Sequence, residues 1–135
     1  MENWKDKLKE KLDKIITSKK LIDYESVVAF FQNQFDLLTE DIKNRDISMV
    51  EFRQIEEVTY FTIYNFDLEL RKRDKSIDVC RTDPNGNVRL IGEIQFRNGF
   101  SYFRSMEDDK SDYLNKVIAD NLFQEAYREL WNEEG

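Results

Sequence analysis

The segment from Ser76 to Ser105, SIDVCRTDPNGNVRLIGEIQFRNGFSYFRS, constrains the fold more than any other part of the chain. Two turn sequences divide it. Residues 83–87 (DPNGN) combine a proline, which fixes φ, with an Asn-Gly pair that adopts positive φ at little cost. The second turn, Asn98-Gly99, is the pair most typical of a two-residue hairpin. The segment therefore predicts three antiparallel strands joined by two tight turns.

Further strands are predicted on the N-terminal side of this segment. Residues 59–64 (TYFTIY) are β-branched and aromatic, and an edge strand is expected within residues 46–58. Residues 88–97 alternate between apolar and polar side chains, which predicts a core side and an outer side. The expected core side holds Val88, Leu90, Ile94 and Phe96. The expected outer side holds Arg89, Glu93, Gln95 and Arg97. Gly92 falls on the core side and predicts a bulge or a large ring packed over it.

Apolar stripes at helical spacing predict helices at both ends of the chain. Residues 2–17 carry one stripe, surrounded by lysines, which consists of Trp4, Leu8, Leu12, Ile15 and Ile16. A second, core helix is expected to follow an N-cap at Asp23 and to end near Asn44, with a stripe of Tyr24, Val28, Phe31, Phe35, Leu38 and Ile42. The acidic residues 107–109 predict the start of a long helix that continues to Trp131.

These elements together predict an α+β fold. It consists of two N-terminal helices, an antiparallel meander of four to five strands, and a C-terminal helix packed on one sheet face. The polar side of the sheet then faces water or a partner. The 135 residues fit one domain, 1–135.

Composition excludes several classes of site. The chain has no histidine and one cysteine, which excludes histidine-activated nucleophiles and zinc sites of the Cys/His kind. Glycine-rich nucleotide loops are absent, so no cofactor and no catalytic residue is predicted. No apolar stretch is long enough to span a bilayer, the N-terminus has no signal-peptide pattern, and Cys80 alone cannot form an internal disulfide. A cytoplasmic protein without membrane contact is expected.

The charge of the chain is unevenly distributed. The net charge is −7, but residues 65–104 carry eight basic against six acidic groups, and residues 105–135 carry three against nine. This acidic segment predicts a face that binds a basic surface on a partner protein, formed by Asp108, Asp109, Asp112, Asp120, Glu125 and Glu129. Direct binding of nucleic acid is not expected for so acidic a chain.

The arginines of the predicted sheet provide a second candidate surface. Four of them are expected on the exposed sheet face, namely Arg71, Arg73, Arg89 and Arg97. Arginine forks bind carboxylates or phosphates well. The alternative is that these arginines form salt bridges across strands and protect the sheet edges.

The strand residue Asp78, followed after a turn by Glu93-Ile94-Gln95, resembles the PD-(D/E)xK nuclease motif over residues 76–97. The resemblance implies that Asp78 and Glu93 hold a divalent metal ion and that Gln95 takes the third position. Two departures weigh against this: glutamine replaces the lysine, and the net charge opposes DNA. The alternative is that both acids face solvent and pair with arginines across strands.

The leading hypothesis is a non-enzymatic regulator or inhibitor that masks the surface of a partner protein. Small acidic immunity proteins and phage inhibitors of host defence are similar in size and charge. A nuclease-like domain or its inactive remnant is the first alternative. The second is a small-ligand binder with a pocket between sheet and helix, lined by Tyr60, Tyr64 and Tyr102. The sequence identifies neither the partner nor the oligomeric state.

Overall fold

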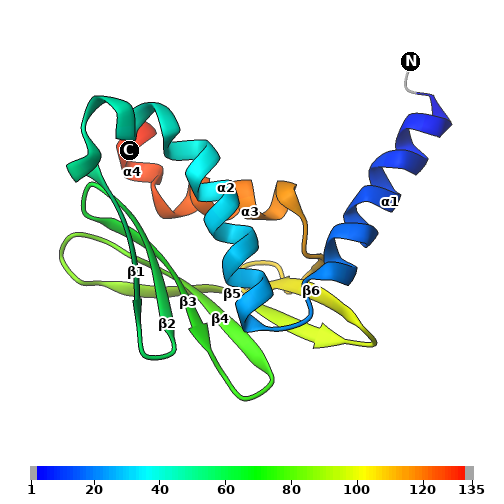
Figure 1. Cartoon of the computed structure of the whole chain (residues 1–135). Coiled ribbons are helices and arrows are strands. Elements are labelled where there is room, and N and C mark those ends of the chain that lie inside the picture. Colours follow the sequence, from blue (N-terminus) through cyan, green and yellow to red (C-terminus); the bar gives the residue numbers. More distant parts are fainter. Residues whose placement is uncertain (1–2, 133–135) are drawn as a thin grey trace.

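Seven antiparallel strands form one sheet, in which each strand pairs with its neighbours in the sequence (Figure 1). The computed structural model describes residues 3–132. The strands are β1 (Val50–Ile55), β2 (Val58–Ile63), β3 (Phe66–Lys72), β4 (Ser76–Thr82), β5 (Val88–Arg97), β6 (Phe100–Ser105) and β7 (Ser111–Tyr113). The predicted meander is confirmed, although the strands number seven rather than four to five. The expected edge strand is β1, and β7 was not expected.

Three helices cover one face of this sheet, and a fourth extends away from it (Figure 1). They are α2 (Tyr24–Arg45), α3 (Lys116–Ala126) and α4 (Arg128–Trp131) on the sheet and α1 (Trp4–Lys20) beside it, with a short 3₁₀ turn, η1 (Ile47–Met49), before β1. The predicted N-cap Asp23 is confirmed, because its carboxylate accepts the Ser26 N–H at 2.9 Å. The α+β prediction is confirmed as well.

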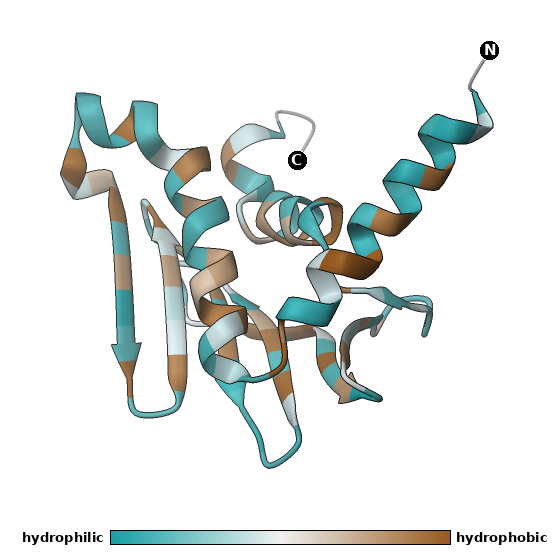
Figure 2. Cartoon of the chain, turned by 45° about the vertical axis from the view of Figure 1, so that its right-hand side comes forward, coloured by the Kyte–Doolittle hydropathy of each residue, from teal (hydrophilic) through white to brown (hydrophobic). Residues whose placement is uncertain are grey.

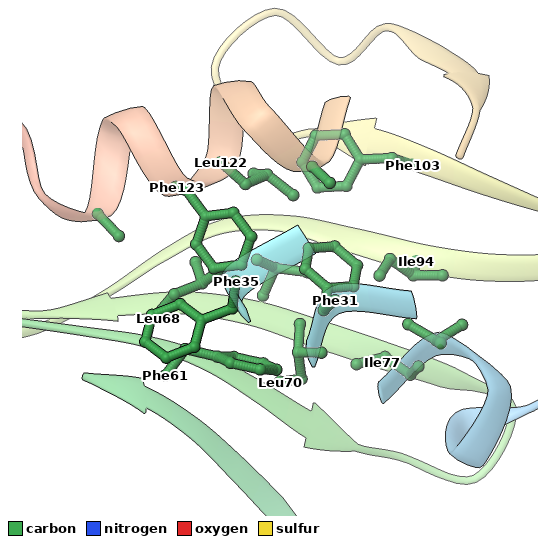
Figure 3. Packing of buried hydrophobic residues seen from close by; sticks show 14 of the residues in the cluster. Phe31, Phe35, Phe61, Leu68, Leu70, Ile77, Ile94, Phe103, Leu122 and Phe123 are labelled. Carbon is green, nitrogen blue, oxygen red and sulfur yellow. The ribbon is translucent and has the colours of Figure 1, made fainter. Parts of the chain in front are cut away.

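Aromatic rings join the two long covering helices to the sheet (Figure 3). Phe35 of α2 packs on Phe61 of β2 with ring centroids 5.2 Å apart, and Phe31 packs on Phe123 of α3 at 5.9 Å. All four rings are buried. They form the centre of a core that also contains Leu68, Leu70, Ile77 and Ile94 from the middle strands. The apolar stripe predicted for α2 therefore faces the core at Phe31 and Phe35.

A β-bulge in β5 corrects the predicted side-chain alternation of that strand. Val79 pairs with Gly92 and Cys80 pairs with Leu90, so Ile91 is an extra residue between the two pairs. Because one additional residue reverses the alternation, Ile91 is 9% exposed and belongs to the core, whereas Leu90 is 44% exposed. The prediction that Leu90 lies in the core is wrong.

The same bulge moves the other residues of the N-terminal half of β5. Val88 is exposed rather than buried. Arg89 lies opposite Arg81 on the side of the helices, where it approaches Glu125 of α3 at 3.8 Å. The prediction that Arg89 shares the outer sheet face with Arg97 is therefore wrong.

Both glycine predictions for the segment 76–105 are confirmed. A Cβ on Gly92 would lie 2.1 Å from the ring of Phe103, so a large ring packs directly over this glycine. Asn98 and Gly99 have φ of 52° and 82°, as a type I′ hairpin requires between Arg97 and Phe100.

The C-terminal segment differs from the predicted long helix. Residues 107–109 lie in the connection between β6 and β7, and α3 begins only after Asn115. The Asn115 side chain accepts hydrogen bonds from Val117 N–H and Ile118 N–H, at 2.9 and 3.3 Å, and so fixes the start of the helix. The helix ends at Ala126, and α4 follows after Tyr127. Pairing of β7 with β6 and the Asn115 cap outweigh the acidic run as a helix start.

The bulge predicts different stability effects for two adjacent residues. Ile91→Ala should lower the free energy of unfolding by about 2–4 kcal/mol, because it leaves a cavity in the core. Leu90→Ala should cost less than about 1 kcal/mol, because the side chain is already partly in water. Urea denaturation of the two variants and the parent measures both values. A larger loss for Leu90→Ala than for Ile91→Ala would contradict the bulge.

Candidate interaction surface

An apolar groove lies where the C-terminal half of α2 faces α3 and α4. Its volume is about 380 Å³, and it is lined by Leu38, Ile42, Ile63, Asp120, Phe123, Gln124, Tyr127, Leu130 and Trp131. Leu38, Leu130 and Trp131 are 45%, 43% and 56% exposed, although all three are large apolar residues. Exposed apolar side chains gathered in one depression are typical of binding surfaces.

The floor of the groove is fixed by hydrogen bonds at the end of α3. The buried Tyr127 hydroxyl donates to the Phe61 carbonyl of β2 at 2.7 Å, and burial raises the pKa of Tyr127 well above its ordinary value. The phenol therefore remains a donor over the physiological pH range. Trp131 Nε1 donates to the Gln124 carbonyl at 2.9 Å, which orients the exposed indole.

An arginine under the helices holds α4 on the sheet. Arg81 of β4 is 8% exposed and donates to the Glu129 carboxylate of α4. The Glu125 carboxylate of α3 lies 3.8 Å from the Arg81 guanidinium. A buried guanidinium needs such partners, because an unpaired buried charge is costly. The pair Arg81–Glu129 thus connects the sheet to the helix that carries Leu130 and Trp131.

The six acidic residues predicted to form one helical face lie in four different parts of the chain. Their positions are the β6–β7 connection for Asp108 and Asp109, β7 for Asp112, α3 for Asp120 and Glu125, and α4 for Glu129. The prediction of a single acidic helix is wrong, because β7 and the break at Tyr127 divide the segment.

Three of these acidic residues are paired with arginines. Glu129 bonds to Arg81, Glu125 lies 3.8 Å from Arg89, and Asp109 accepts from Arg104 at 2.7 Å. In the part of the chain that the structure describes, Asp108, Asp112 and Asp120 accept hydrogen bonds from neutral donors and form no ion pair. Of the six, Asp120 is the one that lines the groove.

The predicted arginine cluster is divided as well. On the outer sheet face Arg71 pairs with Glu69 at 2.6 Å, and Arg73 pairs with Asp78 at 2.8 Å. Arg97 stacks over the Tyr102 ring at 4.5 Å, while Arg89 lies on the other side of the sheet. Arg73 and Arg97 therefore contact residues of a neighbouring strand, whereas Arg71 pairs with a residue of its own strand.

The three residues of the nuclease-like pattern share the outer sheet face. Asp78 and Glu93 are direct partners on β4 and β5. Asp78 is paired with Arg73, and Glu93 accepts a hydrogen bond from Gln95 at 2.6 Å. Among residues 3–132 no group of three or more His, Cys, Asp or Glu side chains lies close enough to hold one metal ion.

The tyrosines proposed to line a ligand pocket do not lie between sheet and helix. Tyr60 and Tyr102 project from the outer face, and Tyr64 lies in the β2–β3 turn. A cavity of about 550 Å³ does lie between β5, β6 and α3, with Arg89, Phe103, Ile118 and Glu125 among its lining residues. Burial also raises the pKa of the Cys80 thiol on β4.

Sequence reasoning missed the residues that shape the groove. The sequence places Leu38 in the core stripe of α2, yet the side chain is 45% exposed and lines the groove. The signal was present in the sequence, because the helix has more large apolar residues than one buried stripe holds. Leu37 is also exposed, at 65%, but lies outside the groove.

Comparison with known proteins gave no significant match among protein-family models, curated proteins or solved structures. None of the helices in the described residues is long and apolar enough to cross a membrane.

The anchoring of α4 predicts unequal effects for two arginines. Arg81→Met should lower the free energy of unfolding by about 1–3 kcal/mol, because the carboxylates of Glu125 and Glu129 lose their buried partner. Arg89→Met is the matched control and should cost less than about 0.5 kcal/mol, because the Arg89 side chain is largely in water. Denaturant unfolding monitored by tryptophan fluorescence measures both. Equal losses would contradict the anchoring role of Arg81.

Proposed function

We propose that the chain is a non-enzymatic interaction protein that masks a basic, apolar surface of a partner protein. The groove between α2, α3 and α4 is the binding site, and a regulator or inhibitor is the class of protein that such a site fits. The observation that supports this most is the exposure of Leu38, Leu130 and Trp131 in one depression.

The composition of the groove fits a protein partner better than a small polar ligand. Its lining is apolar except for Asp120 and Gln124, and a tryptophan stands at its rim. Tryptophan and leucine contacts of this kind supply binding energy when a partner excludes water from them. An amphipathic helix laid into the groove would cover these side chains along its apolar face.

The charge of the covering helices favours a basic partner. Within α2, α3 and α4, seven acidic residues stand against four basic residues, so their net charge is −3. Asp120 places a carboxylate within the groove itself. A partner helix with lysines beside an apolar stripe therefore meets both the apolar lining and the excess negative charge.

A synthetic amphipathic peptide tests this function directly. The probe is a peptide of about 15 residues that repeats leucine and lysine at helical spacing, and its control repeats leucine and glutamate. In a Trp4→Phe variant Trp131 is the remaining tryptophan, so its fluorescence reports on the groove. We expect the lysine peptide to shift the Trp131 emission with saturation, and the glutamate peptide to have no effect.

Two neighbouring leucines provide the matched control for the site. Leu38→Asp should weaken peptide binding at least about tenfold, because it places a charge in the apolar groove. Leu37→Asp adds the same charge to the same helix turn outside the groove and should leave binding within about twofold. Equal affinities of both variants, or equal binding of the two peptides, would contradict the proposed site.

A further inference from the structure

Helix α1 leaves most of its apolar stripe uncovered. Residues 4–13 are all exposed, and Trp4, Leu8 and Leu12 are 68%, 48% and 45% exposed. Figure 2 shows the apolar positions as bands along a helix that stands away from the sheet. A helix of this length has only marginal stability in water unless its apolar stripe is packed against something. We therefore expect the stripe to be covered when the protein is in its functional state.

The C-terminal end of α1 fixes the direction in which the helix projects. Buried Ser18 accepts the Ser101 N–H of β6 at 3.0 Å, and its hydroxyl donates to the Ser101 carbonyl. The Ser101 hydroxyl donates back to the Ser18 carbonyl at 3.3 Å. These reciprocal bonds hold the base of α1 at β6, and its free end points away from α4 (Figure 1). Helix α1 therefore does not reach the groove of its own chain.

The charge of α1 is opposite to that of the rest of the molecule. The helix carries seven lysines against three carboxylates, a net charge of +4, although the chain as a whole has −7. The residues outside α1 therefore carry −11. A lysine-rich helix with a leucine and tryptophan stripe is the kind of segment that the groove between α2, α3 and α4 fits.

From these observations we infer that α1 of one copy binds in the groove of a second copy of the same chain. This inference rests on the proposed function, because it names an occupant of the same groove. The apolar stripe of α1 covers Leu38, Leu130 and Trp131, and its lysines lie near the carboxylates of the covering helices. The groove is then closed to another partner until α1 is displaced.

Other occupants fit the observed charges less well. Pairing of two α1 helices with each other brings two charges of +4 together, which is unfavourable. An anionic membrane attracts α1, but it repels the remainder of the chain, which carries −11. A second copy satisfies both parts, because the basic helix of one meets the acidic body of the other.

Mixing two defective variants of the full chain tests the inference. The helix variant, Leu8→Asp with Leu12→Asp, lacks the stripe but retains the groove. The groove variant, Leu38→Asp with Leu130→Asp, retains α1 but lacks the groove. The measurement is molar mass by light scattering and sedimentation at about 100 μM, where a Kd of that order or tighter is detected. Circular dichroism checks that each variant is folded.

We expect the parent chain to self-associate and each variant to be monomeric. The mixture should form a one-to-one heterodimer, because an intact α1 from one variant meets an intact groove from the other. High salt, near 1 M, should weaken the contact severalfold. A control, Glu10→Ser with Lys14→Ser, changes the opposite face of α1 at constant net charge and should still self-associate. These results would support the inference.

Four results would overturn it. The parent chain could be monomeric, the helix variant could self-associate, or the mixture could form no heterodimer. The fourth result is that the parent chain is monomeric and binds phosphatidylglycerol vesicles through Leu8 and Leu12. The lysine–leucine peptide separates this inference from the proposed function. If the helix variant binds that peptide although the parent chain is monomeric, the groove is a binding site and only its proposed occupant is wrong. If the parent chain does not self-associate and the helix variant does not bind the peptide, both proposals fail.

Discussion

Phe61 is the side chain on which most of the architecture depends. Its ring contacts Phe35 of α2, Phe52 of β1 and Phe123 of α3, with centroid distances of 5.2, 5.4 and 5.8 Å. The carbonyl of the same residue accepts the Tyr127 hydroxyl. A single strand position therefore orients two helices relative to the sheet and fixes the turn that follows α3. The groove lies next to this point, because Phe123 and Tyr127 line it together with the exposed Leu38 and Leu130.

The sequence predicted well those elements whose signals are local. The Asn98-Gly99 turn requires positive φ, and the Asp23 cap requires only residues within one helical turn, so neither depends on a tertiary contact. The close packing over Gly92 was also predicted, because a glycine in a strand leaves room that a neighbouring ring can fill. Most of the failed predictions concern places where a distant contact decides the structure, whereas the Asn115 cap is a local signal that the sequence reasoning missed.

Two features of the sheet, the bulge in β5 and the strand β7, account for the main corrections. Gly92 predicts a bulge or a ring packed over it, but it does not show that an extra residue stands at position 91. The bulge at Ile91 reverses the side-chain alternation and moves Leu90 and Arg89 to the faces opposite to those expected. The strand β7 pairs with β6 across a connection of five residues, 106–110, and Tyr113 packs against Tyr102 with ring centroids 5.0 Å apart. The groove was missed for the same reason, since the sequence shows that α2 has surplus apolar residues but not which of them the sheet covers.

Self-association through α1 would also set when the groove can act. If a second copy occupies the groove with dissociation constant Kd, a competing partner binds more weakly by a factor of about one plus the ratio of chain concentration to Kd. The groove is then open in dilute solution and closed when the chain is abundant. The partner must exceed α1 in apolar contact or in positive charge, and α1 already supplies a tryptophan, two leucines and a net charge of +4. This requirement is selective: it rejects weakly basic helices and admits a partner whose surface is more strongly basic and apolar than α1 itself.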